Sequence, residues 1–162
     1  MLTVVGDDRV GLVKALADVV AGNGGNWERS HLAELAGTFA GVVLVTVPDR
    51  QADRLRAALA PLEGLLDVAV RTTDAQTEPR EERRRVRLDL LGNDRPGIVA
   101  AYGAAFGEAE INIAGMQIAR TSAGGDALSI ITIDQVAPDE LVEQVGAAIE
   151  ATTIRQIGIR PL

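Results

Sequence analysis

The sequence predicts an α+β protein built from two copies of a βαββαβ unit. The first observation is an internal repeat, because residues 6–11 (Gly-Asp-Asp-Arg-Val-Gly) return at 92–97 (Gly-Asn-Asp-Arg-Pro-Gly), 86 residues later. The second is that Asn26 returns as Asn112 at the same offset. The third is that both halves show the same order of strand and helix patterns. A repeat of this length is a small domain rather than a solenoid unit.

The second half shows the order clearly. Alternating apolar residues predict a half-buried first strand, and helical periodicity after a polar turn predicts a helix from about Gly97 to Glu110. A hairpin follows, and then a helix with Pro138 at its first position and two carboxylates in its first turn. The predicted elements are strand 86–90, turn 92–97, helix 97–110, strand 111–121, turn 122–125, strand 126–134, a helix from Pro138 and strand 153–160.

The first half repeats this order, and a glycine-rich run at 22–25 ends its first helix. The predicted elements are strand 2–5, a helix carrying Leu12, Leu16 and Val20, strand 27–35, a turn at 36–37, strand 39–47, a helix carrying Leu55, Leu59 and Leu62, and strand 66–72. Right-handed crossovers then place both helices on one face of a four-stranded antiparallel sheet, which is the ferredoxin-like arrangement.

Between the halves the sequence lacks apolar periodicity and is rich in charge, so we predict a solvated linker. The chain is thereby divided into domain 1–73, linker 74–85 and domain 86–162. The arginines at 83–85 could contact nucleic acid, but acidic residues precede them and the chain carries a net charge of −7. We therefore expect no direct binding to nucleic acid.

The composition also argues against several other classes of protein. The sequence contains no run of about 18 apolar residues, so we expect no membrane span. The residues after Met1 predict a strand rather than a signal peptide. The chain contains no cysteine, which removes thiolate metal sites and cysteine nucleophiles. These features fit a cytoplasmic protein without a membrane partner.

The repeated loop offers chemistry that suits a free amino acid. It leads into a helix N-terminus, where backbone N–H groups without intrahelical partners and the helix dipole attract a carboxylate. Gly11 and Gly97 let a ligand approach the backbone closely. Asp8 and Asp94 lie in the same loop and can attract an ammonium group.

Asn26 and Asn112 begin the next strand, which we expect to lie beside the first strand in the sheet. Their amides can both donate and accept hydrogen bonds, as an amino-acid ligand requires. A structural alternative stays open, because aspartates at such junctions often cap helices, and glycine and asparagine often form turns. Duplication would copy such structural residues too.

These motifs resemble the ACT domain, a small regulatory module that binds amino acids. Residues 93–98 (Asn-Asp-Arg-Pro-Gly-Ile), 111–117 (Ile-Asn-Ile-Ala-Gly-Met-Gln) and 124–128 resemble the serine-binding ACT domain at the end of phosphoglycerate dehydrogenases. Residues 25–30 and 39–42 are more similar to the transcriptional regulators of the glycine cleavage system, which are tandem ACT proteins. The resemblance covers nearly all of the chain outside the linker.

The resemblance implies a regulatory protein that forms a homodimer, binds a small amino acid at interdomain sites and modulates a partner protein. Glycine or serine is the favoured ligand, and no cofactor or metal is implied. The implied contacts come from the loop before the first helix and from the start of the second strand. In this sequence they are Asp94, Gly97, Ile98, Asn112 and Ile113 in the second half, with Asp8, Gly11 and Asn26 in the first.

The chain departs from the family pattern at three positions. Val10 replaces the proline found at Pro96, so the first loop is less rigid. Gly92 stands where the dehydrogenase domain tends to carry a polar side chain. Trp27, beside Asn26, either narrows a pocket or packs into the core. We therefore favour the second half as the ligand-binding one. The alternative is an ACT-fold interaction module without a functional ligand site.

Nothing in the sequence indicates an enzyme. His31 is the only histidine, and its neighbour Ser30 should point to the opposite face of a strand, so the two cannot form a catalytic pair. The spacing of the carboxylates matches no known calcium loop, and no nucleotide-binding loop is present.

Overall fold

The computed structural model describes residues 1–62, 64–72, 85–120, 125–148 and 150–159. It divides into two compact units, Met1–Thr77 and Glu78–Leu162. The predicted linker up to residue 84 and residues 122–124 of the predicted hairpin turn lie outside the described ranges. No helix within those ranges has the length and apolar character that crossing a membrane requires.

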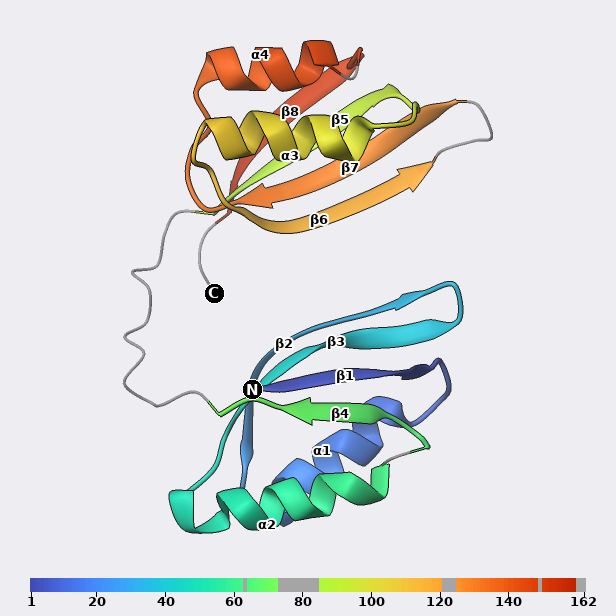
Figure 1. Ribbon diagram of the computed structural model, residues 1–162, viewed down its shortest axis with the longest axis vertical. Coiled ribbons are helices and arrows are strands. Elements are labelled where there is room, and N and C mark those ends of the chain that lie inside the picture. The colour runs from blue at the N-terminus through green and yellow to red at the C-terminus, as the bar shows by residue number, and fades with distance from the viewer. Residues whose placement is uncertain (63, 73–84, 121–124, 149, 160–162) are drawn as a thin grey trace. The chain divides into compact units, whose positions relative to one another are not determined.

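Each unit has the βαββαβ order that the sequence predicts (Figure 1). The first contains β1 (Leu2–Asp7), α1 (Leu12–Gly22), β2 (Asn26–Leu35), β3 (Thr38–Thr46), α2 (Asp49–Leu59), the 3₁₀ helix η1 (Ala60–Leu62) and β4 (Asp67–Val70). The second contains β5 (Arg85–Asn93), α3 (Ile98–Glu108), β6 (Ile113–Arg120), β7 (Asp126–Ile133), α4 (Asp139–Ala148) and β8 (Thr153–Ile159). The fold is α+β and ferredoxin-like in both halves, as predicted.

Several predicted boundaries shift by a few residues. Strand β5 continues through Gly92 and Asn93 because both pair with β7, so the polar turn is shorter than 92–97. Pro138 precedes α4 instead of opening it, and its carbonyl accepts a hydrogen bond from the backbone N–H of Leu141 at 3.0 Å. Arg85, assigned to the linker, is the first residue of β5.

One prediction about the sheets is wrong. The strand order is β2-β3-β1-β4 in the first unit and β6-β7-β5-β8 in the second. The strand that begins with Asn26 is therefore separated from β1 by β3, and β7 likewise separates β6 from β5. The cause is the crossover: α1 carries the chain past the neighbouring position, and the hairpin strand β3 then fills the gap.

Each unit has its own core between the sheet and the helices on one face (Figure 1). The alternation read in the sequence is confirmed in β5, where Val86, Leu88 and Leu90 are all buried. The second core also holds one polar contact, because the Tyr102 hydroxyl lies 2.9 Å from the Ser129 hydroxyl and both side chains are buried. A buried hydroxyl needs such a partner.

Candidate functional site

The loop between the first strand and the first helix has the same backbone geometry in both units. Gly11 and Gly97 occupy the N-cap positions of α1 and α3 in the left-handed region, with φ of 98° and 91°. Neither helix receives a hydrogen bond from a capping side chain. A Cβ atom added to either glycine would meet nothing within 4 Å. The N–H of Ile98, the first residue of α3, donates to the carbonyl of Arg95 at 3.4 Å, and neither helix start receives a capping side chain. Because the N-cap residues are glycines, the idea that the aspartates cap these helices is wrong.

A backbone hydrogen bond ties each loop to the turn of its own hairpin. The N–H of Asp8 donates to the carbonyl of Gly37 at 2.8 Å, and the N–H of Asp94 donates to the carbonyl of Gly125 at 3.2 Å. The hairpin turn thus holds the backbone of the loop aspartate in place. This shared anchor was not visible in the sequence, because the two residues it joins are far apart along the chain.

The two loop aspartates have different electrostatic surroundings. Asp94 Oδ2 lies 2.8 Å from Arg120 Nε, and the Asp94 side chain is only 13% exposed. Asp8 is exposed and has no ion pair with a described residue. At the repeat position of Arg120 the first unit carries Glu34, whose carboxylate instead accepts a hydrogen bond from the N–H of Gly37 at 2.7 Å. An approaching ammonium group would find the Asp94 charge already neutralised, whereas that of Asp8 is not.

At the start of β2, the Asn26 amide is held by a carboxylate. Its Nδ2 donates to Glu28 Oε1 at 2.8 Å, and the same oxygen accepts from the Thr46 hydroxyl at 2.7 Å. The hydrogen bond from Thr46, followed by that from Asn26, lowers the pKa of Glu28 below its usual value, since both bonds favour the charged form. The Glu28 side chain is therefore a carboxylate at neutral pH.

At the start of β6, Asn112 has a different environment. Its backbone N–H donates to Asp134 Oδ1 and its carbonyl accepts from the Asp134 N–H, each at 3.3 Å. Ala114 occupies the repeat position of Glu28. Within the described residues the Asn112 side-chain amide has no hydrogen-bond partner, and Asn112 is exposed. The second unit thus presents an asparagine whose donors and acceptor are open to a ligand.

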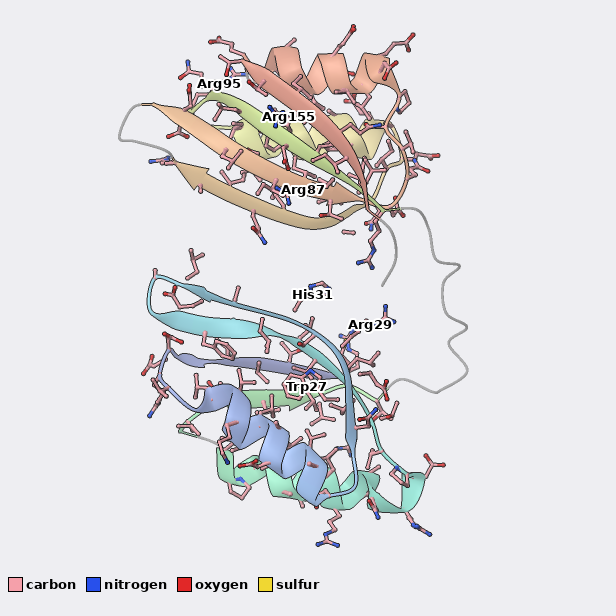
Figure 2. The ribbon with its side chains drawn as sticks, turned by 180° about the vertical axis from the view of Figure 1, so that it is seen from behind. Trp27, Arg29, His31, Arg87, Arg95 and Arg155 are labelled. Carbon is pink, nitrogen blue, oxygen red and sulfur yellow. The ribbon has the colours of Figure 1, made fainter. Side chains whose placement is uncertain are left out.

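The remaining predicted site residues belong to the cores. Ile98 is 6% exposed and Ile113 packs against the same cluster. Trp27 packs against the core of the first unit, which favours the packing interpretation of this side chain over a role in a pocket (Figure 2). These apolar residues fix the helix start and the strand start that carry the polar groups.

Within one unit, the loop and the asparagine lie at opposite ends of the sheet (Figure 1). Asp7, the last residue of β1, pairs with Thr38, whereas Asn26 pairs with Thr46 at the other end of β3. At about 3.3 Å per residue, these two positions are roughly 26 Å apart. The pairs Asn93–Asp126 and Ile113–Ile133 show the same separation of ends in the second unit. A single unit does not bring its loop and its asparagine to one small ligand.

The sequence reasoning missed a β-bulge that recurs in both units. The register shifts between Trp27 and Arg29 in β2, and between Ile113 and Gly115 in β6. A signal was available: Trp27 and Leu32 both pack on the core although they are an odd number of residues apart. A regular strand would send them to opposite faces. The extra residues in these bulges are Glu28 and Ala114.

Other candidate sites receive no support from the described residues. Ser30 and His31 are consecutive residues of β2 that pair with Val43 and Val42, so their side chains point to opposite faces of the sheet. No three histidine, aspartate or glutamate side chains within the described ranges come together in a metal-binding arrangement. Shallow hollows line β4 near Leu59, Val68 and Ala69, away from every predicted ligand residue.

Comparison with protein families finds an ACT-domain model matching residues 1–73 and a second ACT-domain model matching residues 86–150. The D-3-phosphoglycerate dehydrogenase of Synechocystis is 32% identical over 77 residues, which are 47% of this chain and 14% of that protein. The dehydrogenase of Methanocaldococcus jannaschii is 35% identical over 52 residues, or 32% of this chain and 10% of that protein. The chain thus spans only a small part of the dehydrogenases it matches.

Two solved structures share the fold over nearly the whole chain. An unknown protein from Galdieria sulphuraria has a TM-score of 0.75 at 23% identity, covering 98% of this chain and 96% of that one. A protein provisionally assigned as a glycine cleavage system transcriptional repressor has a TM-score of 0.67 at 19% identity, with the same coverage. These two structures show the fold. The two family matches, which together cover most of the chain, show that it belongs to the ACT-domain family, with one ACT domain in each half.

Proposed function

We propose that this chain is a regulatory protein that senses a small amino acid, glycine or L-serine, and modulates a partner protein. The observation that carries the proposal is the pair of helix N-termini at Gly11 and Gly97, each without a capping side chain. Such an N-terminus attracts a carboxylate through its N–H groups and its dipole. The similarity of the chain to segments of phosphoglycerate dehydrogenases and its membership in the ACT family support the same proposal.

The proposed ligand contacts are the predicted residues of the second unit. There the N–H groups that follow Gly97 bind the carboxylate, Asp94 holds Arg120 beside the loop, and Asn112 recognises the ligand through its amide. Ile98 and Ile113 hold the helix and strand starts in place from the core. In the first unit the corresponding groups are Asp8, Gly11 and Asn26.

Because loop and asparagine lie at opposite ends of each sheet, a ligand that touches both requires a second ACT domain. A second copy of the chain can supply it, so we propose a homodimer. Binding would then shift the association of the copies or their contacts with the partner protein. We further propose that the protein acts in the cytoplasm and catalyses no reaction of its own.

Thermal unfolding of the full chain against glycine, L-serine and the other common amino acids tests the proposal. A ligand present at a hundredfold its Kd stabilises the folded state by about 2.7 kcal/mol, and Asn112→Ala should remove that shift. Gln117→Ala is the matched control, because Gln117 is an exposed amide on the same strand. If no amino acid changes the midpoint, the proposal fails.

A protein-interaction module without a ligand site is the second candidate function. The sheet face opposite the helices carries exposed apolar side chains, among them Leu35 at 80% and Val5 at 42% in the first unit, and Ile157 at 45% in the second. On this alternative, Asp94→Ala and Asn112→Ala leave binding to the partner protein unchanged, and no amino acid alters it.

A further inference from the structure

The bulges at the starts of β2 and β6 are equivalent, but the bulged residues are not. A bulge adds one residue that has no partner across the ladder. In β2 this residue is Glu28, whose Oε1 accepts from Asn26 Nδ2 at 2.8 Å and from Thr46 Oγ1 at 2.7 Å. In β6 the bulged residue is Ala114, which has no polar side chain.

The second difference is at the end of the neighbouring strand. The residue paired beyond the bulge is Thr46 in the first unit, and it holds Glu28 against Asn26. The corresponding position in the second unit is Asp134, which accepts from the backbone N–H of Asn112 and donates to its carbonyl. The amide nitrogen of the first asparagine is thus engaged within the chain, whereas that of the second has no partner among the described residues.

A ligand oxygen that approached the bonded N–H of the Asn26 amide would meet Glu28 Oε1, which already accepts from that amide at 2.8 Å. The ligand would have to displace this acceptor, and a negatively charged ligand oxygen about 4 Å from the Glu28 carboxylate would be repelled by about 1 kcal/mol even in water. Removing the acceptor without replacing it also leaves Thr46 without its partner.

We propose that Glu28 closes the Asn26 position to amino acids, so that Asn112 alone of the two asparagines contacts a ligand through its side-chain amide. The identity of the bulged residue, glutamate or alanine, is then the specificity determinant that makes the two ACT domains unequal. This inference rests on the proposed function and adds to it the number of ligands per chain.

Isothermal titration of the full chain with glycine and L-serine tests the proposal. The wild type should bind about one molecule per chain, and Glu28→Ala should raise this to about two, because the added site uses Asn26. Adding Asn26→Ala to Glu28→Ala should return it to about one. Glu34→Ala is the matched control, since Glu34 is an exposed glutamate farther along the same strand, and it should leave the stoichiometry unchanged.

The reciprocal change, Ala114→Glu, should weaken binding to the second unit at least about tenfold, as a loss of about 1.4 kcal/mol would. The inference is overturned if the wild type already binds two molecules and Asn26→Ala removes one, or if Glu28→Ala stays at one. Absence of binding in every variant overturns the proposed function itself, and the inference with it. Thermal unfolding of each variant separates loss of binding from loss of the fold.

Discussion

Glu28 is the residue whose titration tests the hydrogen bonds around Asn26 most directly. We expect its carboxyl pKa, measured by NMR, to lie below the ordinary value of 4.5, because Thr46 and Asn26 both donate to the charged form. A lowered folded-state pKa means that these bonds stabilise the fold at neutral pH, and that this contribution disappears as the pH falls through the lowered value.

Thr46→Val should raise the pKa of Glu28 toward 4.5, since it removes the first of the two donors. Thr38→Val serves as the control because Thr38 is an exposed threonine at the other end of the same strand. An unchanged Glu28 pKa in Thr46→Val would contradict the contact.

Tyr102 and Ser129 are the buried polar pair of the second core, and burial raises the pKa of the tyrosine. We expect Tyr102→Phe and Ser129→Ala each to lower the free energy of unfolding by about 1–2 kcal/mol, because each leaves one buried hydroxyl without its partner. The double variant should cost less than the sum of the two single variants, since no orphaned hydroxyl remains.

Urea unfolding followed by circular dichroism measures these free energies. Trp27 is the only tryptophan and belongs to the first core, so its fluorescence follows that unit separately. Strictly additive losses in the double variant would show that the two hydroxyls do not interact.

Helix α3 offers two glycines whose replacement should have opposite effects. Gly97→Ala should destabilise by about 1–2 kcal/mol, because φ is 91° and alanine is strained in the left-handed region, although its Cβ would meet nothing within 4 Å. Gly103→Ala should stabilise by about 0.5–1 kcal/mol, because Gly103 lies exposed inside the helix, where alanine is the better residue and again meets no neighbour.

Thermal unfolding of both variants checks these signs, and Gly103→Ala acts as the control for adding a methyl group to this helix. A neutral Gly97→Ala would mean that the N-cap glycine does not hold its left-handed conformation.

Local periodicity predicted the elements well, but it could not predict how they meet. The alternation at Val86, Leu88 and Leu90 identified a strand with one buried face, because burial acts on each residue separately. The separation of β1 from β2 and the pairing of Asp94 with Arg120 depend on which strands become neighbours in space. Crossover connections and hairpin lengths determine which strands become neighbours, so no short stretch of sequence predicts it.

The whole protein is expected to build its ligand site from two ACT domains, since each sheet holds its loop and its asparagine at opposite ends. If the second ACT domain comes from a second copy, Asp94→Ala and Asn112→Ala damage different halves of one composite site. Each variant alone should fail to bind L-serine, whereas an equimolar mixture should recover about a quarter of the wild-type sites, because half of the twofold-symmetric pairs are mixed and each mixed pair keeps one intact site.

Equilibrium dialysis of the mixture against L-serine gives the number of sites, and analytical ultracentrifugation with and without L-serine gives the state of association. The control mixes Gln117→Ala with Asn112→Ala. Gln117 lies outside the predicted contacts, so the Gln117→Ala chain keeps both Asp94 and Asn112. If each variant fails alone and their mixture also binds nothing, Asp94 and Asn112 of the same chain form each site, which would contradict a site shared between two copies. Recovery of binding would show that two copies share one ligand site. It would also explain how Asp94 and Asn112 can act on one ligand although they lie at opposite ends of their own ACT domain.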